Sequence, residues 1–214
     1  MASPAKIGAF ALVGSCATAG CAGGIYLTSG TPIKDLINEE YEYILLDTTA
    51  GSGNKDETKW GEVWNSYKTN SNDIFKLTGW DASKTDLNLK EELKKRCNEL
   101  SGSKVSNKES DLYKHVTKYC SRGVTFEEQA KKDRLNVLDT SGATHATIWS
   151  NRHRDKTSIN AHLTKLGITS NNSDGSNIKT GCNTAKAKNK QVEDYSNVYA
   201  SFKEVCIKKA GDPN

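Results

Sequence analysis

The sequence lacks the local motifs on which many enzyme classes depend. It contains no G-x-S-x-G turn, no C-x-x-C pair and no G-x-x-x-x-G-K-[ST] phosphate loop. The stretch GSGNK at 51–55 resembles a phosphate loop, but its spacing is wrong and Asp56 follows the lysine, so we interpret it as a plain loop. We therefore expect no catalytic residue, no cofactor and no enzyme activity.

Apolar residues are also scarce, at 35% of the chain, against 26% charged residues. A unit of about 80 to 90 residues buries only roughly two thirds of its unfolded surface. Small units with so few apolar residues need a covalent staple or a partner to remain folded. The six cysteines are the obvious source of such staples.

The stretch 64–120 occurs twice, because residues 149–206 repeat its pattern. In each copy a tryptophan precedes a cysteine by 33 positions, and a second cysteine follows 23 or 24 positions later. The residues in register are Trp64, Cys97 and Cys120 in the first copy and Trp149, Cys182 and Cys206 in the second. LLDT at 45–48 likewise recurs as VLDT at 137–140. The sequence therefore predicts tandem units at 31–123 and 124–214.

Both units read as mostly α. Apolar periodicity predicts helices near 31–40, 55–77, 89–101 and 112–120, and again near 125–134, 145–166, 178–185 and 195–206. Thr125 and Glu128 form a capping-box pattern at the start of the second unit. Short strands are expected at 41–46 and 135–138. Trp64 and Trp149 lie on apolar helix stripes, which predicts that both belong to the core.

Four cysteines allow three disulfide pairings, and we favour Cys97–Cys120 with Cys182–Cys206. A duplicated unit copies its own internal bonds, and the two spacings are nearly equal. Each pair falls on the inner stripes of two successive helices. In the alternative reading the thiols stay reduced and pack as small apolar groups.

The remaining polar clusters do not indicate a metal or nucleic-acid site. His145, His153 and His162 are spaced by 8 and 9 positions, whereas a zinc pair on one helix needs three or four. His115 lies in the other unit. The basic cluster at 152–156 is too small for a nucleic-acid surface, so we expect neither metal nor nucleic acid.

The N-terminal segment 1–30 predicts a membrane helix, because residues 7–27 carry no charge. As a helix this segment spans about 31 Å, the thickness of a bilayer core. Lys6 precedes it and acidic residues dominate after it, which places the N-terminus inside the cell and residues after Leu27 outside. Gly20 and Gly24 form a G-x-x-x-G pattern that would suit a homodimer.

Three fates of this segment remain open: a retained anchor, a lipoprotein acylated at Cys16, or a signal cleaved near residues 20–24. The lipoprotein reading rests on the small residues before Cys16. All three export the remainder of the chain, and the retained anchor contacts membrane lipid.

The chain resembles a family of paralogous proteins from haemotropic mycoplasmas. The resemblance rests on GIYLTSG at 24–30, LKKRC at 93–97 and YKHVTKYC at 113–120. It implies a surface protein that contacts a host protein or varies antigenically, and it carries no catalytic residue over. Two alternatives stay open: an exported hydrolase or nuclease with a scattered site, and a membrane-associated structural scaffold.

Overall fold

The computed structural model describes residues 30–51, 53–84, 88–169 and 174–213. These residues are mostly helical, as predicted. The helices are α1 Ile33–Glu40, α2 Glu57–Asn70, α3 Lys90–Ser101, α4 Asp111–Tyr119, α5 Phe126–Lys132, α6 Ala146–Arg154, α7 Asn160–Leu166, α8 Ser176–Ala185 and α9 Tyr195–Cys206. The strands are β1 Thr31–Pro32, β2 Tyr43–Leu45, β3 Lys104–Val105 and β4 Ser121–Gly123.

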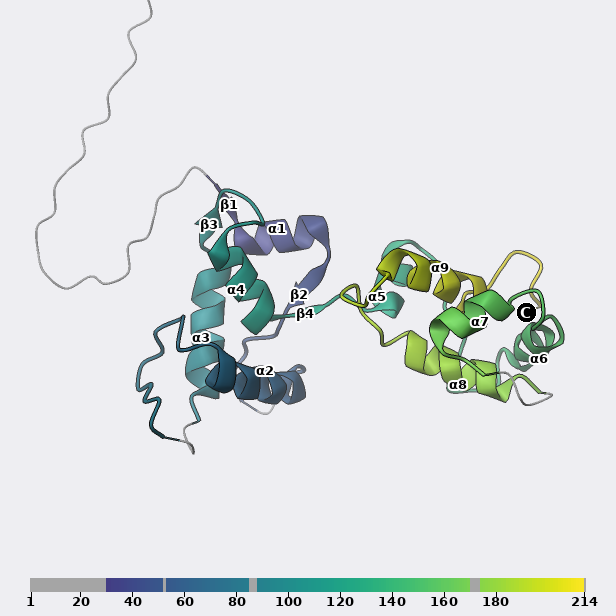
Figure 1. Cartoon of the computed structure of the whole chain (residues 1–214), viewed down its shortest axis with the longest axis horizontal. Helices are drawn as coiled ribbons and strands as arrows, with labels where there is room; N and C mark the ends of the chain where they lie inside the picture. The colour runs from purple at the N-terminus through teal and green to yellow at the C-terminus, as the bar shows by residue number, and fades with distance from the viewer. Residues whose placement is uncertain (1–29, 52, 85–87, 170–173, 214) are drawn as a thin grey trace, which may run out of the picture.

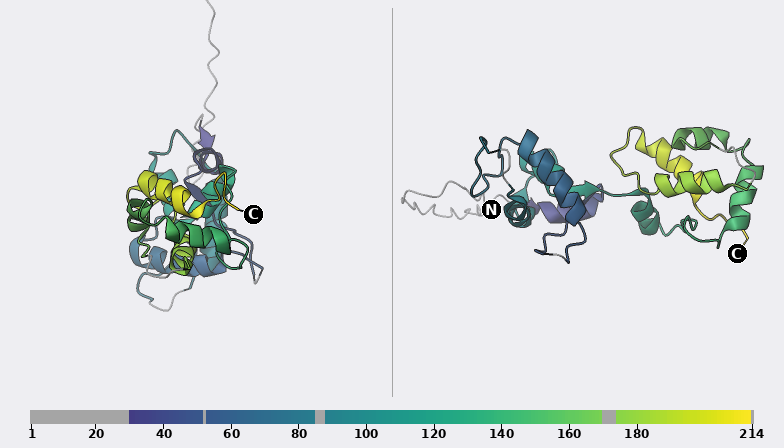
Figure 2. Two further views of the ribbon diagram at one scale, coloured as in Figure 1. Left: turned by 90° about the vertical axis from the view of Figure 1, so that its right-hand side faces the viewer. Right: turned by 90° about the horizontal axis from the view of Figure 1, so that it is seen from below.

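The buried apolar side chains form two separate clusters, which we call the first core and the second core. The first core lies among α1 to α4, and the second core lies among α5 to α9. Figures 1 and 2 show the two groups of helices apart along the long axis, with β2 and β4 lying between them. The predicted boundary between residues 123 and 124 falls between the clusters and remains a prediction.

Two short antiparallel sheets complete the first core. β1 pairs with β3, and β2 pairs with β4 so that Ile44 lies opposite Arg122. The second β-segment predicted at 135–138 is reduced to a single bridge between Val137 and Ile207. Both cores contain a backbone hydrogen bond from a leucine to the second cysteine of the disulfide. Leu46 N–H donates to the Cys120 carbonyl at 3.0 Å, and Leu138 N–H donates to the Cys206 carbonyl at 2.9 Å.

Three expected helix boundaries are wrong. The helix expected at 55–77 ends at Asn70, because Asn72 and Asp73 leave the helical conformation with positive φ angles. The helix expected at 145–166 is broken into α6 and α7, because Ser158 donates both its backbone N–H and its hydroxyl to the Asp155 carbonyl, at 3.0 and 2.7 Å. Such local bonds compete with the helical pattern. The first helix begins at Ile33, since Thr31–Pro32 pairs with β3 as a strand.

Disulfides close both cores, so the prediction of disulfides is confirmed. Cys97 on α3 bonds to Cys120 after α4, with Cα atoms 5.4 Å apart. Cys182 on α8 bonds to Cys206 at the end of α9, with Cα atoms 5.6 Å apart. All four cysteines are buried. Each bond ties two successive helices of its own core together.

The tryptophans are buried, but their hydrogen bonds correct the predicted register. Trp64 and Trp149 are 6% and 2% exposed. The indole N–H of Trp149 donates to the Asp139 carbonyl at 3.2 Å, and in the first core the matching bond runs from Trp60 to the Asp47 carbonyl at 2.6 Å. In this contact Trp149 is matched by Trp60, whereas the sequence comparison places Trp64 in register with it.

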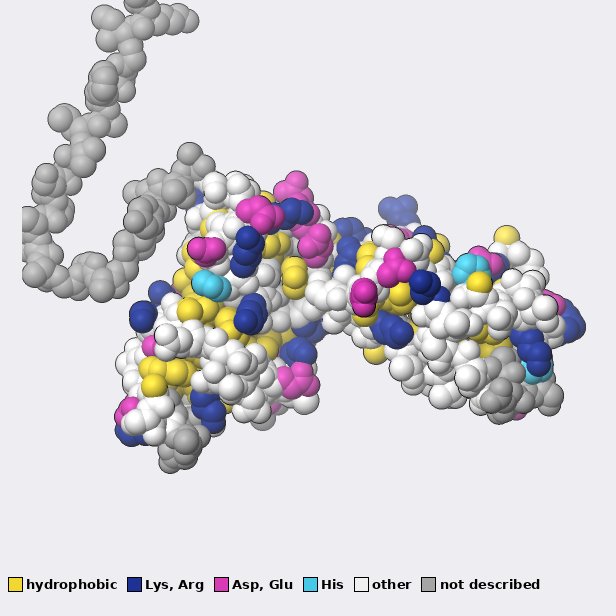
Figure 3. All heavy atoms as spheres, viewed as in Figure 1, with side chains coloured by type: hydrophobic (Ala, Val, Ile, Leu, Met, Phe, Trp, Pro, Cys, Tyr) yellow, Lys and Arg dark blue, Asp and Glu magenta, His cyan; other side chains and the backbone are white. Residues whose placement is uncertain are grey.

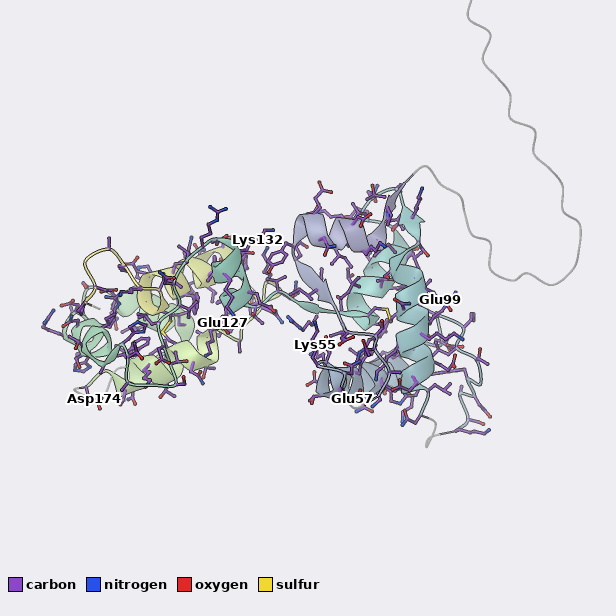
Figure 4. All side chains as sticks on the ribbon, turned by 180° about the vertical axis from the view of Figure 1, so that it is seen from behind. Lys55, Glu57, Glu99, Glu127, Lys132 and Asp174 are labelled. Atoms are coloured by element: carbon purple, nitrogen blue, oxygen red, sulfur yellow. A yellow bond between two sulfur atoms is a disulfide. The ribbon has the colours of Figure 1, made fainter. Side chains whose placement is uncertain are left out.

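A junction joins the two cores through Arg122 and Glu128. The Arg122 guanidinium donates to both Glu128 oxygens at 2.9 and 2.7 Å, and the same carboxylate completes the capping box with Thr125. The Arg122 hydrogen bond, above all other causes, lowers the pKa of Glu128 to about 2. Figure 4 shows Glu127 and Lys132 of α5 on this side of the second core.

Lysine and glutamine side chains add further contacts across the junction. Lys190 Nζ donates to the Tyr41 carbonyl at 2.8 Å, and Gln191 Nε2 donates to the Glu42 carbonyl at 3.1 Å. The Lys132 ammonium lies 4.0 Å from the centre of the Tyr41 ring. Burial, followed by the nearby charge of Lys132, lowers the pKa of Lys190. The junction is therefore polar rather than a third apolar core.

The predicted membrane segment 7–27, with Cys16, Gly20 and Gly24, lies outside the described residues. Within the part of the chain that the structure describes, no helix has the length and apolar character needed to cross a bilayer.

We predict that removing a disulfide destabilises its own core. Replacing both Cys97 and Cys120 by Ala should lower the free energy of unfolding by about 3 kcal/mol, because the loop is no longer closed in the unfolded chain. Urea unfolding followed by tryptophan fluorescence measures this. The Cys182→Ala/Cys206→Ala variant applies the same test to the second core, where Trp149 reports the loss of stability. A loss below about 1 kcal/mol in either variant would contradict the stapling role.

We predict that Glu128→Gln removes an acid-sensitive part of the stability while keeping the capping box. Because the folded pKa of Glu128 lies below its ordinary value of 4.5, the Arg122 pair stabilises the fold fully above pH 4.5. That contribution is lost as the pH falls from 4.5 to about 2. The stability difference between wild type and variant should therefore shrink over this window in pH-dependent urea unfolding. A difference independent of pH would refute the charge pair as its source.

Candidate functional site

A hollow of the described surface lies beside Trp80, at the C-terminal end of α2. It has a volume of about 280 Å³. One aromatic ring and several polar side chains line it, chiefly Lys68, Asn70, Asn72, Trp80, Asp81 and Lys84. We call this hollow the Trp80 pocket.

The backbone below the pocket is held in an unusual conformation. α2 ends at Asn70, and Asn72, Asp73 and Lys76 then adopt positive φ angles of 48°, 50° and 54°. Residues other than glycine rarely adopt such angles, and they cluster where the surrounding structure enforces them. Gly79, with φ of 83°, makes the last turn before Trp80.

A buried tyrosine–aspartate pair enforces this conformation. Tyr67 Oη donates to Asp73 Oδ1 at 3.0 Å and accepts from the Phe75 backbone N–H at 2.9 Å. The same Asp73 oxygen accepts from the Leu77 N–H at 2.9 Å. Burial raises the pKa of the Tyr67 phenol, which keeps it protonated as the donor. The loop is thus fixed from inside the first core.

Two aromatic rings pack against Trp80 at nearly right angles to it. Its ring centroid lies 6.3 Å from that of Trp64 and 5.8 Å from that of Tyr67, at interplanar angles of 79° and 88°. The ring is only partly buried, whereas the other tryptophans are buried. Among the described residues, no hydrogen-bond acceptor is found for its indole N–H. Trp80 therefore offers a rigid, partly exposed aromatic surface.

Asp81 and its neighbours form the far rim. Asp81 Oδ1 accepts from the Ser83 hydroxyl at 2.7 Å and from its N–H at 3.0 Å, and these bonds lower the pKa of Asp81. Lys84 Nζ lies 3.6 Å from Asp81 Oδ2. The carboxylate is thus charged at neutral pH and positioned at the pocket edge.

A second, shallower hollow of about 410 Å³ lies at the junction, between α2, α4, β4 and residues 189–191. Most of its charged groups are paired with each other or with a neighbour: Lys59 with Glu62 at 2.6 Å, and Arg122 with Glu128. The Lys118 ammonium lies 5.0 Å from the centre of the Tyr119 ring. Figure 3 shows acidic and basic side chains interspersed over both cores on one face of the molecule. The junction hollow therefore has a structural explanation.

Two polar groups have the composition of a catalytic pair or base, namely Lys94 and the pair His162–Ser201, but both make contacts that hold the fold together. Lys94 is 2% exposed and is paired with Glu57 and Glu91 at 2.7 and 2.8 Å. Burial opposes its charge, but these carboxylates raise the pKa of Lys94, so the amine stays protonated. His162 Nδ1 lies 3.2 Å from the Ser201 hydroxyl, but Ser201 is buried at 4% exposure.

The histidines and the basic cluster at 152–156 likewise make structural contacts and do not form a shared site. Arg152 is 8% exposed and pairs with both oxygens of Asp212 at 3.1 and 2.7 Å. His145 Nδ1 accepts from the Asp139 backbone N–H at 2.7 Å. Within the described ranges, no cluster of three histidine, cysteine, aspartate or glutamate side chains could hold a metal ion.

The sequence-predicted residues do not meet at one site. Cys97, Cys120 and Trp64 lie in the first core, and Cys182, Cys206 and Trp149 lie in the second. Sequence reasoning missed the Trp80 pocket. The available signal was a tryptophan just after Gly79 and outside the regular apolar stripe, within a polar stretch.

Comparison of the chain with protein-family models, curated proteins and solved structures found no match.

We predict that the stability at position 72 depends on backbone conformation. Asn72→Ala should lower the free energy of unfolding by about 1 kcal/mol, because a β-carbon opposes positive φ when no amide compensates. Asn72→Gly should stay within about 0.5 kcal/mol of wild type, since glycine adopts this angle freely but gains entropy when unfolded. Urea unfolding measures both variants. Equal losses for alanine and glycine would contradict the strained loop.

Proposed function

We propose that the chain is an exported surface protein that acts by binding, and that two similar disulfide-closed helical units make up its extracellular part. The observation that carries this proposal is the buried disulfide in each core. Structural disulfides persist in oxidising compartments and are rare in cytosolic proteins. Small cores with few apolar residues are the class that depends on them.

The repeated bonding pattern supports the duplication. In both cores the leucine before an Asp-Thr pair, Leu46 or Leu138, donates its backbone N–H to the carbonyl of the second cysteine. In both, an indole N–H then donates to the carbonyl of that aspartate. We infer that residues 31–123 and 124–214 derive from one ancestral unit, with Trp60 rather than Trp64 as the counterpart of Trp149.

The N-terminal segment supplies the proposed location. Residues 7–27 have the length and the lack of charge of a membrane anchor, with the N-terminus inside and residues after Leu27 outside. Acylation at Cys16, cleavage near residues 20–24 and dimerisation through Gly20 and Gly24 remain proposals on the same segment. The role we infer is contact with a host protein or antigenic display, as the family resemblance implies.

We predict that trypsin added to intact cells releases peptides from residues after Leu27. All of the thirty lysine and arginine residues except Lys6 lie after Leu27 and give the protease ample sites, and reduction should be needed to separate peptides joined by the disulfides. Mass spectrometry of the released peptides is the measurement. Permeabilised cells provide the control for total digestion, and a cytoplasmic protein provides the control for leakage. Full protection in intact cells, with digestion after permeabilisation, would refute export.

A further inference from the structure

We propose that the Trp80 pocket binds a single pyranose ring, as a free sugar or as the terminal residue of a glycan. The inference goes beyond the proposed function, because binding by the purified chain does not depend on where the chain is located. It rests on the shape of the pocket, on one exposed aromatic ring and on the polar groups around it.

The aromatic ring supplies the first half of the recognition. A pyranose has an apolar face of C–H groups, which packs against a flat aromatic surface, and an edge of hydroxyl groups. Trp80 is the partly exposed tryptophan among four, since Trp60, Trp64 and Trp149 are at most 6% exposed. Its T-shaped contacts with Trp64 and Tyr67 hold the ring before a ligand arrives. Such preorganisation lowers the entropic cost of binding.

The rim supplies the second half. Sugar hydroxyls both donate and accept hydrogen bonds, so they need partners of both kinds. The Asn70 and Asn72 amides can donate and accept, and the Asp81 carboxylate accepts. Lys68 and Lys84 bring ammonium donors to the same lining. This mixture around one aromatic face matches a polyhydroxylated ring.

Other ligand classes fit the pocket less well. A phosphate would require a clear excess of positive charge, but the charged Asp81 carboxylate belongs to the same lining and lies 3.6 Å from the Lys84 ammonium. A purely apolar ligand would leave the amides and the carboxylate without partners. The volume of about 280 Å³ is close to the lower end of the roughly 300–1,000 Å³ of pockets for drug-sized ligands, so it suits one ring.

The backbone at the rim of the pocket is held in an unusual conformation. Asn72 lies at φ of 48°, next to Asp73 at 50°, and the Tyr67–Asp73 bond fixes both. Backbone strain of this kind is typical of ligand-binding sites. The backbone that carries Asn72 is therefore held next to a bond made inside the first core.

The test uses the full chain, purified without sugar-based detergents and titrated with methyl pyranosides of several hexoses. We expect a saturable change in tryptophan fluorescence, because Trp80 is the partly exposed indole of the four. A glycan array probed in parallel shows whether the sugar is recognised alone or as a terminal residue. A lack of saturable change with every pyranoside up to about 10 mM, together with no binding on the array, would overturn the proposal.

The variants separate binding from folding. Trp80→Ala should weaken binding at least about tenfold, and Trp80→Phe should retain binding by calorimetry while losing the fluorescence change. Asn72→Gly removes the amide but suits the backbone angle, so it should weaken binding several-fold while the unfolding curve stays the same. Asn65→Ala, on the exposed side of α2 and outside the pocket, is the matched control and should bind as wild type.

Two further outcomes count against the proposal. Sugar binding that survives both Trp80→Ala and Asn72→Gly places the site elsewhere. Competition by inorganic phosphate or by a nucleoside, dependent on Trp80, shows that the pocket serves a different ligand class. Because these measurements use the purified chain, their failure leaves the proposed export of the protein to be judged by protease accessibility alone.

Discussion

The disulfide between two successive helices is the constraint on which each core depends. In the first core it holds α3 against the end of α4, and the Cys120 carbonyl then accepts the N–H of Leu46, which fixes β2. In the second core Cys206 plays the same two parts for α8, α9 and Leu138. Each bond closes a loop of 23 or 24 residues, and such closure contributes about 3 kcal/mol, a large share of the stability of a small domain.

The sequence predicted the parts of the fold that follow from apolar periodicity and from the spacing of the cysteines. The helical stripes located most helices, and the nearly equal cysteine spacings indicated the bonds at Cys97–Cys120 and Cys182–Cys206. It failed where side chains act locally, as at Asp155 and Ser158, which break one expected helix into two. The sequence comparison also places Trp64 opposite Trp149, whereas Trp60 makes the hydrogen bond that matches that of Trp149. The aspartate and the tryptophan that it bonds are 13 residues apart in the first core and 10 apart in the second. A comparison of the adjacent residues in the sequence therefore aligned Trp149 with Trp64 instead of Trp60.

The Trp80 pocket could not be derived from the sequence for a different reason. Its rim depends on positive φ angles at Asn72 and Asp73, and these are imposed by the bond between Tyr67 and Asp73, six residues apart. Tyr67 reads in the sequence as an ordinary core aromatic, and Asp73 reads as a loop residue. With the two paired inside the core, the backbone at 71–77 is tied to α2, and Trp80 remains at the surface beside polar groups. The proposed sugar site thus depends on the same packing that stabilises the first core.

The central claim is that the two cores are covalently closed units of an exported chain. Peptide mapping of the protein taken from its native cells, alkylated before lysis and digested without reduction, tests it most directly. The account predicts two linked peptide pairs, joining Cys97 to Cys120 and Cys182 to Cys206. Alkylated free thiols at these four positions, or a peptide linking Cys97 to Cys182, would contradict it.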